Sequence, residues 1–415
     1  MMRIRGIVKN KNARTVMSNF IYLTLLKGIS FLFPLITLPY LAKVLGPDKF
    51  GAIAFATSII VIIETITDWG FNYTATRDIA IKRNDLKYVS NIYCQVFYAR
   101  ILLMIISFIG LWALIQIIPD FKSNEKLILF TFLYIPGNIL FPQWLFQAFE
   151  RMRYITILSI LAKIVFTAFI FVIITKPSDY VYEPVLNAGS FLISGFIAQY
   201  IIIKKFKLIL CKPQFREILL NIKGSTNMFI SLILPNLYTN FSVIILKSYC
   251  GDLATGIYNG GQKFQGVVEQ LTQILSRAFF PFLARHKEKH HIYVMISGVI
   301  ALAASIFMFF GAPWFVNIFL TEEFSDAIVV MRIFSITPIF LFLTNTYGTN
   351  YLVIVGKENI LRNIVIIVSI IGFALTWLLT PQYSYIGVAS TITIVRGVRG
   401  LWTFVEAKKI QRSNG

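Results

Sequence analysis

Long apolar stretches separated by short polar segments run along the whole chain. Many of these stretches reach about 18 residues or more, whereas a buried helix of a soluble protein rarely needs more than about 10–14. Helices satisfy every backbone polar group inside lipid, and the alternating segments of about ten residues that mark a β-barrel are missing. The pattern therefore predicts about twelve membrane-spanning helices, near residues 19–45, 48–72, 89–118, 126–148, 155–175, 184–203, 227–249, 257–283, 292–317, 327–353, 361–380 and 385–405.

Composition supports the same fold class. The 415 residues are 57% hydrophobic and only 14% charged, and the mean hydropathy is +0.71. A soluble domain carries about 25% charged residues. The chain is therefore predicted to be an all-α integral membrane protein.

The placement of lysine and arginine predicts the orientation of the spans. With a cytoplasmic N-terminus, the cytoplasmic segments hold about six times as many of these residues as the opposite loops. The richest are the N-terminal tail, residues 77–87 and residues 204–223. Both termini are therefore predicted to be cytoplasmic. The net charge of +20 reflects this topology and attraction to anionic lipid, so it does not indicate nucleic-acid binding.

Two glycine-bounded turns indicate an internal repeat. Gly46-Pro-Asp-Lys-Phe-Gly51 joins the first two spans, and Gly251-Asp-Leu-Ala-Thr-Gly256 joins the seventh and eighth, about 205 residues later. Unless such turns recur by chance, the two halves are related by an axis along the membrane normal. The predicted domains are an N-terminal six-helix lobe (1–203), a basic cytoplasmic linker (204–226) and a C-terminal six-helix lobe (227–415).

Ionisable residues inside the predicted spans are the candidates for function. A charge facing lipid at mid-depth costs about 2.5–3.5 kcal/mol, so many of them must pair or face a wet cavity. The alternative is that long side chains near a boundary reach the headgroups. The cations are Lys27, Arg100, Lys163, Lys263, Arg277, Arg332, Arg396 and Arg399, and the carboxylates are Glu64, Asp68 and Glu269.

Helical spacing groups some of these charges on one face. Residues 257–283 contain a polar face that runs nearly the whole span, formed by Asn259, Gln262, Lys263, Gly266, Glu269, Gln270, Gln273 and Arg277. Such a face can also hold helices together by hydrogen bonds. Its density and its mixture of charges favour a cavity.

The excess of cations over carboxylates predicts an anionic substrate, because a desolvated phosphate needs fixed positive partners. The candidate substrate contacts are Lys27, Arg100, Asn259, Lys263, Gln273 and Arg277. Glu64, Asp68 and Glu269 are candidates for ion coupling, since a carboxyl in low dielectric can bind and release a proton. Each could equally be a static partner of a neighbouring lysine or arginine.

No catalytic chemistry is predicted. The three cysteines are scattered, the three histidines share one basic loop, and there is no phosphate-binding glycine loop or metal-ligand spacing. We therefore predict no catalytic residues, no metal and no cofactor.

Five segments carry a resemblance to a known family. They are Leu38-Pro-Tyr-Leu-Ala-Lys-Val-Leu-Gly-Pro-Asp-Lys-Phe-Gly51, Asp68-Trp-Gly-Phe-Asn-Tyr-Thr-Ala-Thr-Arg-Asp-Ile-Ala80, Pro142-Gln-Trp-Leu-Phe-Gln-Ala-Phe-Glu-Arg-Met152 and, more loosely, Pro235-Asn-Leu-Tyr-Thr-Asn240 and Tyr258-Asn-Gly-Gly-Gln-Lys263. With twelve spans, the chain resembles the Wzx-type O-antigen flippases of the multidrug/oligosaccharidyl-lipid/polysaccharide exporter (MOP) superfamily. These motifs are specific for the family and not for a substrate.

The resemblance implies a V-shaped pair of pseudo-symmetric lobes around a central cationic lumen. It also implies a bacterial inner-membrane flippase that moves an undecaprenyl-pyrophosphate-linked oligosaccharide to the periplasm by alternating access, with proton or cation coupling. Membrane lipid, a polysaccharide polymerase and a chain-length regulator are the expected partners.

Two alternatives come from other functional classes. A multidrug exporter of the same superfamily would carry organic cations, so its lumen should be rich in carboxylates. A membrane polysaccharide polymerase or ligase would need a sizeable periplasmic loop with catalytic arginines or histidine, and the longest predicted loop here is cytoplasmic.

Overall fold

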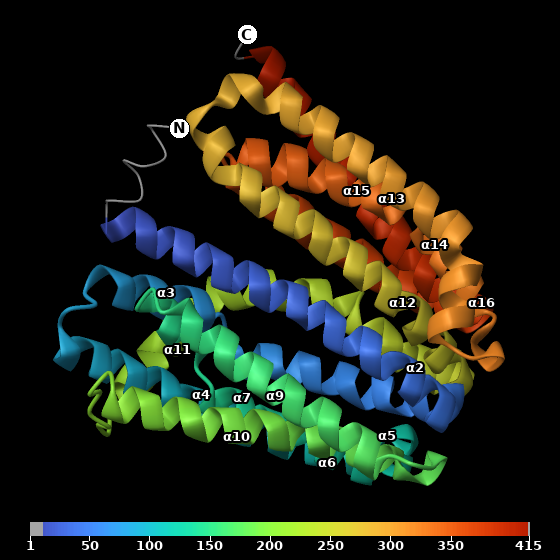
Figure 1. Cartoon of the computed structure of the whole chain (residues 1–415), viewed down its shortest axis with the longest axis horizontal. Coiled ribbons are helices and arrows are strands. Elements are labelled where there is room, and N and C mark those ends of the chain that lie inside the picture. Colours follow the sequence, from blue (N-terminus) through green and yellow to red (C-terminus); the bar gives the residue numbers. More distant parts are fainter. Residues whose placement is uncertain (1–10, 414–415) are drawn as a thin grey trace. The chain divides into compact units, whose positions relative to one another are not determined.

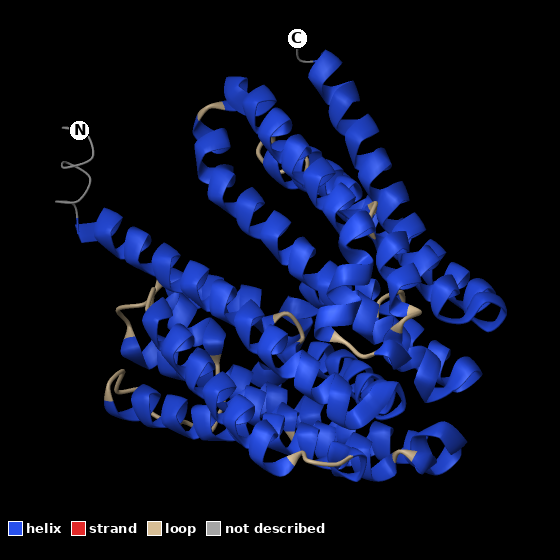
Figure 2. Ribbon diagram, turned by 45° about the vertical axis from the view of Figure 1, so that its right-hand side comes forward, coloured by secondary structure: helices blue, strands red, loops and turns tan. Residues whose placement is uncertain are grey.

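The computed structural model describes residues 11–413, and all regular structure in that part of the chain is helical (Figure 2). The first half contains α2 (Lys11–Asp68), α3 (Phe71–Ile81), α4 (Leu86–Ile117), α5 (Pro119–Ser123), α6 (Glu125–Phe132), α7 (Tyr134–Leu140), α8 (Gln143–Ala148), α9 (Met152–Ile173), η1 (Pro177–Val181) and α10 (Tyr182–Lys204). The second half contains α11 (Phe215–Ile233), η2 (Leu234–Leu237), α12 (Asn240–Arg285), η3 (Lys287–Lys289), α13 (His290–Phe319), η4 (Glu322–Phe324), α14 (Ala327–Phe334), α15 (Thr337–Leu343), η5 (Thr344–Leu352) and α16 (Glu358–Ser413).

Nine helical segments within the described residues are long and apolar enough to cross a membrane. Three of them, Phe33–Ile81, Phe215–Arg285 and Glu358–Arg412, contain a residue with non-helical backbone angles, at Gly46, Gly251 and Ser384 respectively. In Figure 1 the α2 ribbon turns back at its break. Each of these three segments holds two of the predicted spans, so the twelve-span prediction is confirmed.

The long helices keep apolar side chains on their outer faces. In α4, Ile105, Ile109 and Ile117 are 49%, 63% and 75% exposed, and Trp112 on the same stretch is 45% exposed. A soluble protein rarely leaves such a continuous apolar surface uncovered. Lipid solvates it at no cost, so this surface follows from the membrane environment.

Two predicted spans are broken into shorter pieces. Residues 126–148 form α6, α7 and α8, with a non-helical break at Phe141 and Pro142. A proline disfavours helical angles at the residue before it, which explains this break. Residues 327–353 form α14, α15 and η5, and η5 is a π-helix over Thr344–Leu352.

The described chain divides into two compact units. Unit 1 contains the residues up to Tyr40 together with Ile59–Leu232, and unit 2 contains Leu41–Ser58 together with the residues from Ile233 on. The segment around the Gly46 break is thus grouped with the second half of the chain. The lobe bounds 1–203, 204–226 and 227–415 stay a prediction.

The core of unit 1 is aromatic. Phe71 of α3, Tyr93 of α4, and Trp144 and Phe146 of α8 are each at most 2% exposed and belong to one cluster, which α9 and α10 complete. Large rings bury much apolar area with few rotatable bonds. This cluster fixes α3 and α4, which carry much of the polar chemistry described below.

Close glycine contacts hold the two repeated turns together in unit 2. A Cβ atom placed on Gly51 would lie 2.0 Å from the carbonyl oxygen of Asp252, and one on Gly256 would lie 2.0 Å from the carbonyl oxygen of Pro47. Only hydrogen atoms fit at these positions, so the turns pack backbone against backbone. The repeat noticed in the sequence therefore marks a structural contact.

The break in α16 predicts a stabilising substitution. Ser384 has φ 50° and ψ −134°, a conformation that glycine adopts freely and that costs other residues about 1–3 kcal/mol. We expect Ser384→Gly to raise the free energy of unfolding by about 1 kcal/mol, measured by titration of the purified protein with sodium dodecyl sulfate in mixed micelles. Ser390→Gly, at a helical position of the same element, should instead lower it by about 0.5–1 kcal/mol. If both changes altered the free energy of unfolding equally, the backbone at Ser384 would not be strained.

Candidate functional site

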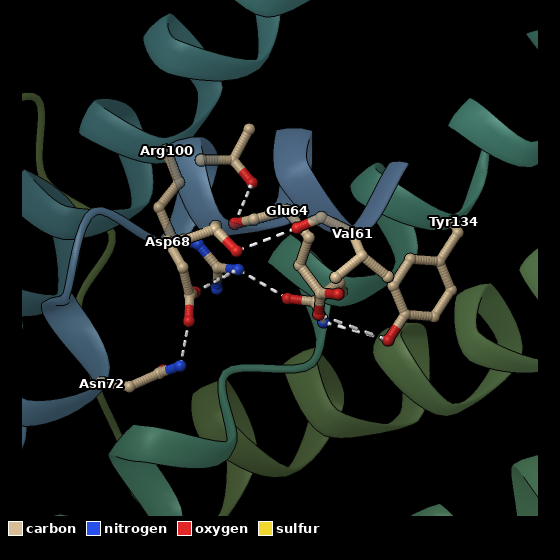
Figure 3. A network of polar contacts seen from close by, with 9 residues as sticks. Val61, Glu64, Asp68, Asn72, Arg100 and Tyr134 are labelled. Atoms are coloured by element: carbon tan, nitrogen blue, oxygen red, sulfur yellow. Dashed lines mark hydrogen bonds and ion pairs between the residues drawn. The ribbon is translucent and has the colours of Figure 1, made fainter. Parts of the chain in front are cut away.

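A network of charged side chains lies inside unit 1, between α2 and α4 (Figure 3). Asp68 is the last residue of α2, and Glu64 precedes it by one turn, so both carboxylates lie on one helix face. Arg100 of α4 places Nη2 2.8 Å from Oδ1 of Asp68. The side chains of Arg100 and Asp68 are 3% and 17% exposed, so this ion pair is largely removed from water.

Amide and hydroxyl groups connect the two carboxylates. Asn138 of α7 donates a hydrogen bond of 2.7 Å to Oε1 of Glu64 and accepts one of 2.5 Å from Arg100 Nη2. The Tyr134 hydroxyl donates to the same Glu64 oxygen at 3.4 Å, and Asn72 donates to Oδ2 of Asp68 (Figure 3). Glu64, Asn138, Arg100 and Asp68 therefore form one continuous chain of contacts.

The charges of this network do not balance. Two carboxylates share one guanidinium, so the network carries a net negative charge when both are ionised. A buried charge without a partner is costly. One added proton or small cation would therefore balance the charge of the network.

A second charged cluster lies inside unit 2, between α12 and α16. Nη2 of Arg396 lies 2.7 Å from Oε2 of Glu269. The same carboxylate accepts hydrogen bonds from Gln265 at 3.1 Å and from Gln273 at 3.5 Å. Glu269 thus has a cationic and two amide partners, which favours the static-partner interpretation over ion coupling for this residue.

The sign of the charge in unit 2 is opposite to that in unit 1. Arg399 lies one turn from Arg396 and also interacts electrostatically with Glu269, so two guanidiniums face one carboxylate. Nη1 of Arg396 and Nε of Arg399 are buried and have no hydrogen-bond partner among the described residues. Buried donors without acceptors are rare and costly. The arrangement can therefore accept an anion.

The structure distributes the six candidate substrate residues over both units. The side chain of Lys27 lies outside the described residues. Arg100 is buried in the unit 1 network, and Gln273 contacts Glu269 in unit 2. Lys263 and Arg277 are exposed on α12, and Asn259 on the same helix is half-buried.

Sequence reasoning did not identify Asn138 or Gln265 as parts of these networks. It named Arg396 and Arg399 only among the cations inside the spans, for which contact with lipid headgroups was the alternative. One signal was available. Gly46 and Gly251, Gly51 and Gly256, and Glu64 and Glu269 are each 205 residues apart. The repeat therefore places a carboxylate at the same position in each half. Glu269 pairs directly with an arginine, whereas Glu64 is linked to one through the amide of Asn138.

No group of three or more histidine, cysteine, aspartate or glutamate side chains within the described residues is arranged to hold a metal ion.

Comparisons with known proteins decide the family. The family described as "Polysaccharide biosynthesis protein" matches residues 16–287, which is well over half of the chain. The chain belongs to this family. The protein named "Putative O-antigen transporter" of Escherichia coli (strain K12) is 26% identical over 391 residues, covering 92% of this chain and 94% of that protein. The protein of the same name from Shigella dysenteriae is 26% identical over 380 residues, covering 90% and 95%.

Solved structures share the fold. The lipid II flippase MurJ in an inward closed conformation has a TM-score of 0.74 at 11% identity, over 94% of this chain and 87% of that one. A multidrug resistance MATE family transporter of the MOP superfamily, in an inward-facing conformation, has a TM-score of 0.67 at 15% identity, over 92% and 95%. These structures confirm the predicted all-α membrane fold class, and the family match and the two curated relatives confirm the resemblance to O-antigen exporters.

Both of these curated relatives are named as transporters. With nine long apolar segments in residues 11–413, the chain is a multi-pass membrane protein.

Proposed function

We propose that this protein is a flippase for undecaprenyl-pyrophosphate-linked oligosaccharide repeat units of a surface polysaccharide such as O-antigen. It moves them from the cytoplasmic to the periplasmic leaflet of the bacterial inner membrane by alternating access. Family membership and the relatives named as O-antigen transporters support this proposal. The two termini are cytoplasmic in this arrangement, as the lysine and arginine distribution predicts.

The observation that carries the proposal is the uncompensated positive charge in unit 2. Arg396 and Arg399 keep buried donor atoms without acceptors, although a carboxylate lies next to them. Arginine donors match phosphate oxygens in geometry and charge. A pyrophosphate is the anion that such a lipid-linked sugar brings, and Lys263 and Arg277 on the polar face of α12 add further positive charge.

Coupling to an ion gradient is assigned to unit 1. Glu64 and Asp68 share Arg100, so their network gains stability from one added proton or cation. A group that binds an ion in one conformation and releases it in another supplies the free energy for transport. Glu269 remains a further candidate for ion coupling. Its alternative role is that of a static partner of Arg396.

A multidrug cation exporter is the alternative that the shared MATE fold raises. Its cargo is positive, so the two arginines beside Glu269 would repel it. The charge in unit 2 therefore favours a phosphate-bearing cargo. A polysaccharide polymerase and a chain-length regulator are the protein partners that this function would require next to the flippase.

Charge reversal on α12 tests the proposal. We expect Lys263→Glu and Arg277→Glu each to abolish surface polysaccharide and to leave the amount of protein in the membrane unchanged, because each places a negative charge where a pyrophosphate must pass. Surface polysaccharide is measured on gels of cells that carry the variant as their only copy. Lys287→Glu in η3 makes the same charge change in a connection between spans and should leave export normal. Full export by both α12 variants would contradict the role of this face.

A further inference from the structure

A cavity in unit 1 is lined mostly by residues with polar side chains, none of which belongs to the charged network. Its volume is about 340 Å³, and side chains of α3, α4 and α11 line it. Ligand pockets in proteins occupy about 300–1,000 Å³, so the cavity is large enough for a small ligand. The proposed transport cycle assigns no role to it so far.

Hydrogen bonds hold the inner wall of the cavity in place. Gln95 of α4 is 8% exposed. Its amide nitrogen donates to Oε2 of Glu217 at 3.3 Å, and its amide oxygen accepts from Asn221 at 2.7 Å. On the α3 side, the hydroxyls of Thr74 and Ser225 lie 2.8 Å apart. These groups are oriented before any ligand arrives, which lowers the entropic cost of binding.

Several polar atoms of the lining remain available to a ligand. Both hydrogen bonds that Glu217 accepts within the described residues, from Gln95 and from the backbone of Gln214, use Oε2. Arg77 contacts Asp78 through Oδ1 only. One carboxylate oxygen on each of two helices is therefore left as an acceptor within the described contacts, beside the amide of Asn221.

The charge of the lining selects the class of ligand. Asp78 and Glu217 are two carboxylates, and Arg77, which is 70% exposed, is the one cation of the lining. A phosphate would meet repulsion here. Sugar hydroxyl groups donate to carboxylates and exchange hydrogen bonds with amides, so a neutral sugar ring fits where an anion does not.

Beside its polar residues, α11 also contributes an exposed apolar position to the cavity. Leu220 lines it and is 58% exposed, which offers a surface for the C–H face of a sugar. Gly224 lies one turn further along the same helix, and a Cβ atom there would have no neighbour within 4 Å. Glycine in a helix interior is unfavourable, and here it leaves the backbone accessible from the cavity.

We infer that this cavity is a saccharide-binding subsite that takes a neutral sugar of the cargo glycan, separate from the arginines that take its pyrophosphate. This inference rests on the proposed function. The cavity adjoins residues 77–87, which the charge distribution predicts to be cytoplasmic. The sugar is therefore bound on the side where the repeat unit is assembled, and binding there distinguishes a finished repeat unit from the bare lipid carrier.

Filling the cavity tests the inference. Gly224→Leu adds a large side chain at a lining position whose Cβ site has open space around it, and Gly224→Ala adds a smaller one. Gly110→Leu on α4 is the matched control, because Gly110 is also helical with nothing within 4 Å of its Cβ position, and it does not line the cavity. Binding to the purified protein in nanodiscs is measured with three probes: undecaprenyl pyrophosphate bearing the repeat unit, undecaprenyl pyrophosphate without sugar, and the free repeat-unit oligosaccharide.

We expect Gly224→Leu to weaken binding of the glycan-bearing lipid and of the free oligosaccharide by about tenfold or more. Binding of the sugar-free lipid should be unchanged, and Gly110→Leu should behave as wild type with all three probes. If the wild type binds the free oligosaccharide, the cavity recognises the sugar without its lipid. If the wild type binds only the glycan-bearing lipid, the cavity recognises the sugar only when it is attached to the lipid. Equal binding of the glycan-bearing lipid by the wild type and Gly224→Leu would overturn the inference.

A complementation experiment in cells distinguishes a failure of this inference from a failure of the proposed function. Wild-type protein that restores no surface polysaccharide to a strain lacking its flippase contradicts the proposed function. Restoration by the wild type and equally by Gly224→Leu contradicts the sugar subsite alone. We expect restoration by the wild type and by Gly110→Leu, and a reduced amount of polysaccharide with Gly224→Leu.

Discussion

Replacing Arg100 with methionine is expected to lower the free energy of unfolding by about 3–5 kcal/mol, because it leaves a buried carboxylate without its cation. Arg100 is only 3% exposed, and its guanidinium is the one positive group in the network that contains Glu64, Asp68 and Asn138. Methionine fills a similar space without charge, so the loss reports the electrostatics and not a cavity. Denaturation by sodium dodecyl sulfate in mixed micelles measures the change.

Arg83 supplies a matched control for this prediction. Its guanidinium lies 2.8 Å from Glu150, the same distance as in the Arg100–Asp68 pair, but the two side chains are 43% and 50% exposed. An exposed ion pair contributes about 0–1 kcal/mol, so Arg83→Met should have little effect. Adding Asp68→Asn to Arg100→Met should recover part of the lost stability, since one of the two carboxylates left without a cation is then removed. If Arg100→Met lowered the free energy of unfolding no more than Arg83→Met, Arg100 would not be balancing the carboxylate charge of the network.

The positions of the spans could be predicted because lipid imposes a simple rule. Each crossing needs about 20 apolar residues with internally satisfied backbones, and the boundaries at Gly46, Gly251 and Ser384 lie where hydrophobic runs stop. The interior breaks were not predicted, although Pro142 marks one of them. Apolar content remains high across such a break, so hydropathy alone does not reveal it.

The sequence predicted which charged residues belong to the candidate site, but it did not predict which of them form contacts with one another. Charges inside apolar spans are costly, so Glu64, Asp68, Arg100 and Glu269 stood out from the sequence alone. Which charge meets which depends on packing between helices far apart in the chain. Asp68 and Arg100 come from α2 and α4, and Glu269 and Arg396 are 127 residues apart. Spacing along one helix contains no information on such contacts.

The structure gives a physical reason for the two similar turns, which were a weak signal in the sequence. Gly51 and Gly256 were noticed only as bounds of two similar turns, and chance recurrence was an open alternative. In unit 2 their backbones are in direct contact. Glycine at both positions is required because each turn presses on a carbonyl oxygen of the other, at Asp252 and Pro47.

Gly51→Ala is accordingly expected to lower the free energy of unfolding on the order of 3 kcal/mol. The added carbon would lie 2.0 Å from the Asp252 carbonyl oxygen and 2.7 Å from the Gly256 nitrogen. Both are backbone atoms, so no side-chain rotation relieves the clash, and the turns must separate. Gly256→Ala should have a similar effect through Pro47. The loss is again measured with sodium dodecyl sulfate in mixed micelles.

Gly266→Ala is the matched control, because Gly266 lies in α12 with no atom within 4 Å of its Cβ position. Alanine there should raise the free energy of unfolding by about 0.5–1 kcal/mol, as expected for glycine replaced in a helix interior. Both changes add one carbon in unit 2. The difference between their effects on the free energy of unfolding therefore measures the contribution of the contact between the turns. If Gly51→Ala were as stable as Gly266→Ala, the backbone contact between residues 46–51 and 251–256 would not exist in the folded protein.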